Sequence, residues 1–446
     1  MQLRAAAAPA QSISAEAAAA LVQSGMWLDY GGGVCQPNAF DAALAPRVPE
    51  LHDIKIRNCI SMRPVQALEA DPAGERVYFL NLHFGGWDRK MHDAGHGHYI
   101  PVNLGEIPDY YRRFMAPVDI AIIKTCPPDA DGFFNLSAGN LWHRGVIERA
   151  KTVIVEVCSG LPYCPGVETG IHASEVDYII DGGSTPPAEL PNPAPGEVDR
   201  AVASQIAAEI EDGACLQIGI GGMPNAVCGL LATSGVKDLG VHTEMLTDGI
   251  MQLYQGGHIT GARKHTDPGK IVYTFALGSG ALYRAMHNNP DLLSCPVDYT
   301  NAPHIIMQNP RAVAINSTTQ VDLLGQAASE TDGTRHISGT GGQAQFVRGT
   351  YAAPGGKSFI CLPSTYDKRG ARRSRIVPQL TPGNVVTTTR ADMMYVVTEY
   401  GCVNLKGKSV PERARALIGL AHPDFREELE RAAYDMRLIP RGFTFG

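Results

Sequence analysis

The chain has 446 residues, of which 44% are hydrophobic, so it is long enough to bury sizeable cores and to form two or three domains. The 38 Lys and Arg residues are outnumbered by 45 Asp and Glu residues, and the net charge of −7 gives no general attraction to nucleic acid or to acidic membranes. These values exclude a small binding module and argue against a nucleic-acid-binding protein.

The cysteine pattern and the hydropathy favour a cytoplasmic protein. No two of the ten cysteines form a Cys-x-x-Cys pair, so we expect reduced thiols that act mostly as small buried hydrophobes. No stretch approaches the roughly 20 apolar residues that a membrane span needs. The alanine-rich start, Leu3–Ala10, lacks the leucine-rich centre of a signal peptide. We therefore expect a soluble protein without a membrane partner.

The first 180 residues alternate β-rich runs with helical segments. The pattern predicts a helix over 14–25, with Ser14 as its N-cap and Gly25 as its stop. Strands are expected at Ile54–Ile60, Arg76–Leu82, Val118–Lys124 and Thr152–Val157. This alternation indicates an α/β domain with a largely parallel sheet.

A proline-dense segment over 183–197 cannot continue a helix or a central strand. We place a linker there, between a domain over 1–182 and a domain over 198–446. The second half begins with a helix that carries Val198, Val202, Ile206 and Ile210 on one face. Further elements are expected in this order: strands at Ala214–Ile218, Lys270–Phe275, Val313–Asn316, Ser358–Leu362, Val385–Thr389 and Met394–Thr398, then helices at Pro411–Ala421 and Asp424–Met436. The predicted fold class is therefore two open, largely parallel α/β domains of similar character.

A glycine-rich turn, Gly219-Ile-Gly-Gly-Met-Pro-Asn225, follows the expected strand 214–218 and leads into a helix expected to begin at Ala226. Glycines let backbone N–H groups approach an anion or a carbonyl closely, and a helix N-terminus adds a favourable dipole. An ordinary tight strand-to-helix turn is the alternative interpretation.

Glu244 follows Gly-Val-His-Thr, which is typical of the carboxyl end of a strand, where α/β folds place reactive groups. A lone glutamate there is more often a surface or salt-bridging residue. Further motifs stand downstream over 275–283, 316–326, 338–343, 396–401 and 421–426. Each by itself is compatible with turn chemistry.

In order and spacing, these motifs resemble the butyryl-CoA:acetate and 4-hydroxybutyrate CoA-transferase group of the acetyl-CoA hydrolase/transferase family. The group also includes acetyl-CoA hydrolases and itaconate CoA-transferases, and the resemblance covers nearly the whole chain. It implies the CoA-transferase fold, acyl-CoA and a small carboxylic acid as substrates, no required metal, and a homodimer or homotetramer. It also implies that the CoA thioester is lined by Gly221, Gly222, Met223, Pro224, Asn225, Thr319 and Gly342.

The resemblance further implies that Glu244 is the catalytic nucleophile of a ping-pong reaction. Glu244 would attack the acyl-CoA thioester, the CoA thiolate would return to give a glutamyl-CoA thioester, and an acceptor carboxylate would reverse the sequence. Three positions depart from the family pattern, because the family commonly has an aliphatic residue at Thr319 and aspartate at Gln345 and Asn404. These departures weaken a role for Thr319 and remove carboxylate roles at the other two positions.

The chain looks closest to the itaconate branch, with succinyl-CoA as donor. A loop that carries His96, His98 and Asn103 would suit a second carboxylate on the acceptor. The alternatives are a butyryl- or 4-hydroxybutyrate-CoA:acetate CoA-transferase, an acyl-CoA hydrolase, and a non-catalytic CoA-binding protein.

Two motifs are left with open interpretations. The spacing of His92, His96 and His98 would suit a metal, although the transferase mechanism needs none and we expect none. A basic run would either meet the phosphates of CoA or form a solvated, flexible loop. This run comprises Lys368, Arg369, Arg372, Arg373 and Arg375.

Overall fold

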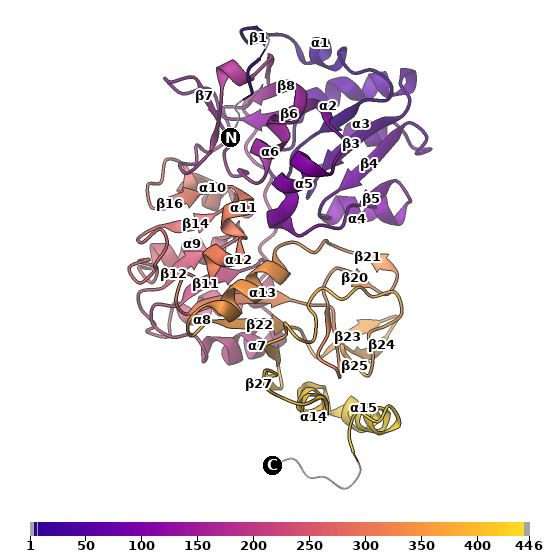
Figure 1. Ribbon diagram of the computed structural model, residues 1–446, viewed down its shortest axis with the longest axis vertical. Coiled ribbons are helices and arrows are strands. Elements are labelled where there is room, and N and C mark those ends of the chain that lie inside the picture. The colour runs from indigo at the N-terminus through magenta and orange to yellow at the C-terminus, as the bar shows by residue number, and fades with distance from the viewer. Residues whose placement is uncertain (1–3, 7, 441–446) are drawn as a thin grey trace. The chain divides into compact units, whose positions relative to one another are not determined.

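The structure is a computed structural model that describes residues 4–6 and 8–440 (Figure 1). Leu3 and Ala7, which belong to the alanine-rich start, lie outside the described residues. The chain divides into two compact units that are interleaved in sequence. Unit 1 comprises residues 1–191, 244–248 and 271–301, and unit 2 comprises residues 192–243, 249–270 and 302–446. The linker and domain limits expected from the sequence remain a prediction.

Unit 1 is built on an eight-stranded sheet in the order β1-β10-β8-β6-β2-β3-β4-β5. Every neighbouring pair is parallel. Strands buried on both faces read as continuous apolar runs, and β6 (Val118–Thr125) has that character. The other strands of this sheet are β1 (Gln11–Ser12), β2 (Trp27–Asp29), β3 (Ile54–Asn58), β4 (Val77–Asn81), β5 (Gly97–Tyr99), β8 (Ala150–Val157) and β10 (Tyr178–Asp181). The four strands expected from the sequence in this half are confirmed.

Short strands and helices complete unit 1. The strands are β7 (Phe133–Asn135), β9 (Gly170–His172), β13 (Met245–Leu246), β14 (Ile271–Tyr273), β15 (Phe275–Ala276) and β16 (Leu292–Ser294). The α-helices are α1 (Ala15–Ala19), α2 (Ala39–Leu44), α3 (Gln66–Glu69), α4 (Gly86–Asp93), α5 (Ile107–Arg113), α6 (His143–Ile147), α10 (Gly280–Met286) and α11 (Val297–Thr300). Three 3₁₀-helices lie at Ala45–Glu50, Leu104–Glu106 and Ala173–Glu175.

Helix α1 begins as expected but ends early. The hydroxyl of Ser14 accepts a hydrogen bond from the backbone N–H of Ala17 at 3.1 Å, which is an N-cap. Beyond Ala20 the backbone closes i→i−3 bonds, from Leu21 to Ala18 and from Val22 to Ala19, so the chain tightens before it reaches Gly25. The expected helix over 14–25 was therefore too long.

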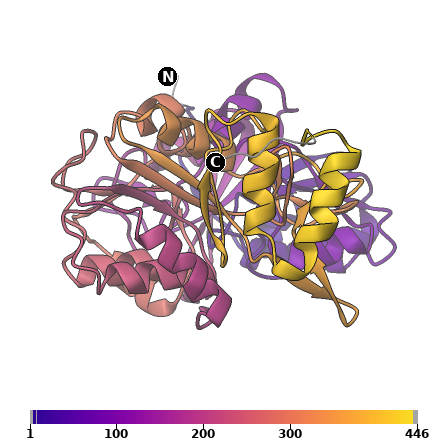
Figure 2. The same ribbon diagram turned by 90° about the horizontal axis from the view of Figure 1, so that it is seen from below.

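Unit 2 contains the strand order β12-β11-β17-β22-β26-β27, parallel except for the last pair. These strands are β11 (Cys215–Ile218), β12 (Gly240–His242), β17 (Ala312–Ser317), β22 (Lys357–Cys361), β26 (Tyr395–Thr398) and β27 (Gly401–Asn404). The α-helices of this half are α7 (Glu197–Ala207), α8 (Gly222–Leu231), α9 (Asp248–Gln255), α12 (Pro303–Ile306), α13 (Gln343–Ala352), α14 (Val410–Leu420) and α15 (Pro423–Asp435). Figure 2 shows α14 and α15 side by side in yellow. Their buried leucines belong to the same hydrophobic core cluster as Ile376 and Val396. Large parallel sheets with helices confirm the predicted α/β class.

Small antiparallel pieces and one parallel pairing accompany this sheet, and one expected strand is absent from it. The small strands are β18 (Gln320–Asp322), β19 (Ala327–Ala328), β20 (Thr331–Asp332), β21 (Arg335–His336), β23 (Thr365–Lys368), β24 (Ala371–Ser374) and β25 (Ile376–Val377).

The prediction of a strand at Val385–Thr389 was wrong, because this segment makes only the isolated bridge Ala327↔Thr388. Val385 and Val386 point to solvent, so the β-branched run does not reflect burial in a sheet.

The cysteines are free thiols in the described part of the chain, and all are buried except Cys402, which is half-buried. Burial raises the pKa of Cys126, Cys164 and Cys228 to about 12 and that of Cys215 to about 11. At neutral pH these side chains are protonated, so they pack as small hydrophobes.

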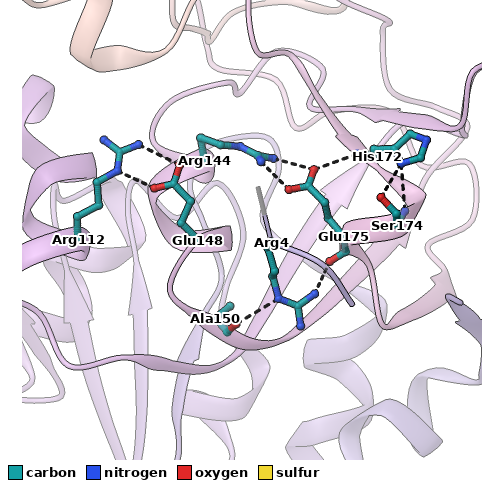
Figure 3. A network of polar contacts seen from close by, with 8 residues as sticks. All are labelled: Arg4, Arg112, Arg144, Glu148, Ala150, His172, Ser174 and Glu175. Carbon is teal, nitrogen blue, oxygen red and sulfur yellow. Dashed lines mark hydrogen bonds and ion pairs between the residues drawn. The ribbon is translucent and has the colours of Figure 1, made fainter. Parts of the chain in front are cut away.

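Arg4 anchors the start of the described chain next to a buried ion pair of unit 1 (Figure 3). Arg4 donates to the carbonyls of Ala150 (3.3 Å) and Glu175 and forms an ion pair with Asp177 at 2.5 Å. The Glu175 carboxylate binds Arg144 in a two-pronged arrangement at 2.7 and 3.3 Å. The side chains of Arg144 and Glu175 are only 9% and 5% exposed. Removing either charge would therefore leave the other one buried without a countercharge.

Glu175→Gln is expected to lower the free energy of unfolding by about 3–5 kcal/mol, because the buried guanidinium of Arg144 loses its countercharge. The control is Glu148→Gln, which breaks the more exposed pair with Arg112 and should cost under about 1 kcal/mol. Urea unfolding of the two variants checks this, and equal losses would contradict it.

Candidate active site

Glu244 lies at the start of a short paired segment in unit 1. Strand β13 (Met245–Leu246) runs parallel to β15 (Phe275–Ala276). The backbone carbonyl of Glu244 accepts hydrogen bonds from the N–H groups of Thr274 at 3.0 Å and Phe275 at 3.3 Å. The side chain is half-buried, so a carboxylate here is fixed by its backbone yet reachable. The sequence placed Glu244 just beyond a strand, and β12 does end two residues before it.

The Glu244 carboxylate is oriented by Asn301, a fully buried residue directly after α11. The Asn301 amide Nδ2 donates to Glu244 Oε2 at 2.6 Å. The amide oxygen of Asn301 in turn accepts a hydrogen bond from the Thr300 hydroxyl at 3.1 Å, which fixes which amide atom faces the carboxylate. A short bond to an ionised acceptor stabilises the carboxylate form and sets its direction.

The Glu244 carboxylate lies near Cys59, at the carboxyl edge of the unit 1 sheet. Cys59 directly follows β3, and burial raises the pKa of its thiol, with nearby carboxylates, Glu244 among them, adding to the shift. Gly32, in the loop after β2, approaches Cys59 so closely that an added Cβ would lie 2.9 Å from the Cys59 carbonyl oxygen. The loops after β2 and β3 therefore border the glutamate, at the edge where parallel sheets place ligands.

Asp248 closes the other end of the paired segment. Its carboxylate accepts from the Ser279 hydroxyl at 2.5 Å and from the Ser279 N–H at 3.0 Å. Gly278 is required beside it, because an added Cβ would lie 2.4 Å from Asp248 Oδ2. The motif over 275–283 thus holds the segment 244–248 at both ends, through strand pairing and through the hydrogen bonds of Ser279.

A polar cavity of about 450 Å³ also belongs to unit 1. Arg63 supplies a cation to its wall, and its Nη2 donates to the carbonyl of Pro186 at 3.1 Å. Asp41 is buried beside it, and burial raises the pKa of this carboxyl to about 6. The remaining lining residues are Gln36, Pro37, Asn38, Pro64, Gln66 and Glu69. The wall of the cavity therefore carries one cation, Arg63, and two carboxyl groups, Asp41 and Glu69.

The glycine-rich turn in unit 2 is the N-terminus of α8. Gly221 is the N-cap, with φ of +122°, a conformation that L side chains rarely adopt. Helix α8 begins at Gly222, not at Ala226 as expected. Pro224 is tolerated in the first turn, because an N–H group at that position would have no hydrogen-bond partner within the helix. Four of the expected CoA-binding residues, Gly221–Pro224, share a cavity of about 160 Å³ with Asp199, Val202, Ile220, Ser317, Thr318, Cys361, Leu362 and Pro363.

The remaining expected CoA-binding residues do not line this cavity. The side-chain amide of Asn225 contacts Asn192, while the Thr319 hydroxyl lies 2.6 Å from the Ala328 carbonyl oxygen and 3.0 Å from that of Thr331. Gly342 is the N-cap of α13, so the second glycine loop, 338–342, also opens a helix. Glu330 supports this loop, because its carboxylate accepts from Thr340 at 3.1 Å and Thr387 at 2.9 Å.

The histidine motif lies on α4, on β5 and in the turn between them, where His96 stands, in unit 1. The His92 ring is 2.8 Å from the Gly97 carbonyl, and the His98 ring packs 4.9 Å from that of Tyr78. Within residues 4–6 and 8–440, no group of three or more His, Cys, Asp or Glu side chains is arranged to hold a metal ion. In the same residues no helix is both long and apolar enough to cross a membrane.

Sequence reasoning missed Asn301, Asp248 and Arg63. Asp248 stands four residues after Glu244. Its closeness in the sequence could have indicated that it belongs to the same site. Asn301 lies 57 positions beyond Glu244 and carries no local motif, so only the fold reveals the contact.

Comparison with known proteins assigns this chain to a family. Residues 5–189 match the acetyl-CoA hydrolase/transferase N-terminal domain, and residues 278–433 match the C-terminal domain of the same family. The butyryl-CoA:acetate CoA-transferase of Anaerostipes caccae is 45% identical over 423 residues, which cover 94% of this chain and 95% of that protein. The 4-hydroxybutyrate coenzyme A transferase of Clostridium kluyveri is 44% identical over 348 residues, covering 78% and 80%.

The crystal structure of RipA from Yersinia pestis has a TM-score of 0.87 to this structure and 36% sequence identity, and the match covers 96% of this chain and 98% of RipA. The resemblance inferred from the motifs is thereby confirmed, and so is the α/β fold. The chain belongs to the acetyl-CoA hydrolase/transferase family, as an enzyme of the CoA-transferase kind.

Proposed function

We propose that this enzyme transfers CoA from an acyl-CoA to a free carboxylic acid through a glutamyl-CoA thioester on Glu244. The observation that carries the proposal is the 2.6 Å hydrogen bond from Asn301 to a half-buried Glu244 carboxylate at the carboxyl edge of a parallel sheet. A carboxylate is the nucleophile that this chemistry needs, because only an acyl anhydride keeps the activation of the thioester.

The proposed steps balance without a proton or a cofactor. One Glu244 oxygen attacks the thioester carbonyl carbon, the C–S bond breaks, and the CoA thiolate leaves a mixed anhydride. The thiolate then attacks the side-chain carbonyl carbon of Glu244, and the donor acid departs as a carboxylate. The acceptor carboxylate attacks the resulting glutamyl thioester, and the same two steps run in reverse.

Each addition develops negative charge on a carbonyl oxygen, which needs N–H donors. The N-terminus of α8 at Gly222 and that of α13 after Gly342 present such donors and favour negative charge. We propose that Gly221, Gly222, Met223, Pro224 and Asn225, together with Gly342, line the CoA thioester. For Thr319 the proposal is limited to van der Waals packing, because its hydroxyl contacts the Ala328 and Thr331 carbonyls and its backbone N–H donates to the Ala328 carbonyl at 2.9 Å.

We further propose that the acceptor is a dicarboxylate such as itaconate and that succinyl-CoA is the donor. The support is Arg63 in the 450 Å³ cavity of unit 1, because a guanidinium binds a second carboxylate in a two-pronged arrangement. The expected loop contributes less, since the Asn103 amide already donates to Glu106 at 3.0 Å. We propose a cytoplasmic homodimer or homotetramer, as the family resemblance implies.

Incubation with acyl-CoA is expected to modify Glu244. Hydroxylamine trapping or borohydride reduction followed by peptide mass measurement should locate the change there and nowhere else. Glu244→Ala should lower transfer by at least about 10³-fold, because the nucleophile is lost. The loss of stability should be about 1–3 kcal/mol, from the unsatisfied Asn301 amide, and so below that of a large core deletion. An unmodified Glu244 would contradict the mechanism and favour a non-catalytic CoA-binding protein.

Asn301→Ala is expected to slow formation of the glutamyl thioester by roughly 10- to 100-fold, because a hydrogen bond to a charged group is lost. Asn309→Ala is the matched control: it removes another fully buried asparagine, which binds the Thr266 hydroxyl at 2.8 Å in unit 2. Single-turnover kinetics of both variants separate orientation of Glu244 from general destabilisation. Equal slowing in both would refute the role of Asn301.

Transfer from succinyl-CoA is expected to be faster to itaconate than to butyrate, and Arg63→Met should reduce only the itaconate rate. Thiol release without any acceptor measures hydrolysis in the same assay. A butyrate rate equal to or above the itaconate rate would refute the dicarboxylate preference and favour the butyryl-CoA:acetate alternative. Thiol release that ignores the acceptor would favour a hydrolase.

A further inference from the structure

The basic run 368–375 forms a defined hairpin in unit 2 (Figure 1). Strands β23 and β24 pair in antiparallel register, and Lys368 stands opposite Ala371. The two residues between them, Arg369 and Gly370, have φ of +53° and +78°, which is the geometry of a two-residue I′ turn. Glycine adopts it freely, whereas an arginine there costs about 1–2 kcal/mol. The tip of the hairpin therefore carries the cation of Arg369 in a backbone conformation that is unfavourable for it.

The two faces of this hairpin differ in charge. Cross-strand partners share a face, so Tyr366, Lys368 and Arg373 lie on one face, while Asp367 and Arg372 lie on the other. On the second face, Arg372 has Asp367 opposite it and approaches Asp424 at 3.6 Å. On the first face, Lys368 has one carboxylate, Asp332, at 3.9 Å. No described residue forms an ion pair or hydrogen bond with the Arg373 side chain.

The first face continues toward the cavity at the N-terminus of α8. The guanidinium of Arg375 lies 4.7 Å from the ring centre of Tyr366, and its Nη1 donates to the Thr319 carbonyl at 2.9 Å. Thr318, the preceding residue, lines that cavity, and so does Pro363, which stands two residues before β23. From Pro363 to Lys368 an extended chain spans about 17 Å. A strip of cations thus leads outward from the cavity.

We propose that Lys368 and Arg373 on this face of the hairpin bind the phosphate groups of coenzyme A. The inference rests on the proposed function, which places the thioester end of CoA at the cavity beside Gly221–Pro224. The phosphates of CoA stand at the opposite end of the pantetheine arm from the sulfur. Arg373 offers a two-pronged donor set for a phosphate and Lys368 offers a point charge, and both form charge-assisted hydrogen bonds.

The test compares acyl-CoA with acyl-pantetheine, which has the same thioester but no phosphates. Arg373→Ala and Lys368→Ala are expected to raise KM for acyl-CoA by about 5- to 20-fold at low salt, with kcat little changed. Neither should alter kcat/KM for acyl-pantetheine. Arg372→Ala is the matched control, because it removes an equal charge from the opposite face of the same hairpin.

Calorimetric titration of CoA into the same variants gives a readout that needs no catalysis, so a failure of the transfer mechanism at Glu244 leaves this binding test valid. Dephospho-CoA separates the two phosphate positions: if it binds parent and Arg373→Ala equally, Arg373 contacts the 3′-phosphate, and otherwise it contacts the pyrophosphate. The proposal is overturned if Arg372→Ala weakens CoA as much as Arg373→Ala does. It is also overturned if acyl-pantetheine and acyl-CoA are affected equally.

Discussion

The parallel pairing of residues 244–246 with 275–277 is the interaction on which the site in unit 1 depends. Two N–H groups hold the carbonyl of Glu244, Asn301 holds its carboxylate, and Asp248 ties the far end of the segment to Ser279. A nucleophile on a free loop would lose its direction with every backbone motion. Here the backbone, the carboxylate and the following turn are each fixed by hydrogen bonds, so the glutamate that we propose as nucleophile would need no further ordering.

Both glycine-rich loops of unit 2 share one physical design. Each ends in a glycine that caps a ten-residue helix, Gly221 for α8 and Gly342 for α13. The first N–H groups of a helix have no partner within it, and the helix dipole adds partial positive charge at the same place. Glycine at the cap lets a ligand atom approach those donors. This shared design explains why both motifs, 219–225 and 338–343, are rich in glycine.

The sequence predicted the long regular elements well and the local departures poorly. Strands such as β6 and β8 were evident because strands buried on both faces leave continuous apolar runs. The strand expected at Val385–Thr389 failed because β-branched residues also occur in extended segments that lie on the surface. The start of α8 was misplaced by four residues because proline reads as a helix breaker, although it is tolerated in a first turn.

For the candidate site, the sequence singled out Glu244 and the glycine loops, because these have local patterns and a family resemblance, and their roles stay predictions. The partners of Glu244 were not visible, since Asn301 reaches it only through the folding of the segment 271–301 into unit 1. The two faces of the basic hairpin were also hidden. Which arginine shares a face with Tyr366 depends on the register of β23 and β24, and a slip of one residue would exchange them.

The burial of the cysteines determines how this chain responds to thiol chemistry. Thiolates, not thiols, react with disulfide and maleimide reagents, and burial holds the pKa of Cys126, Cys164, Cys215 and Cys228 far above neutral pH. Even Cys402, the half-buried one, has a pKa raised to about 11. In an assay that detects free CoA with a thiol reagent, the folded protein should therefore give little background signal, despite its ten cysteines. The same packing makes reagent uptake a sensitive report of unfolding, because the signal rises only when the cores open.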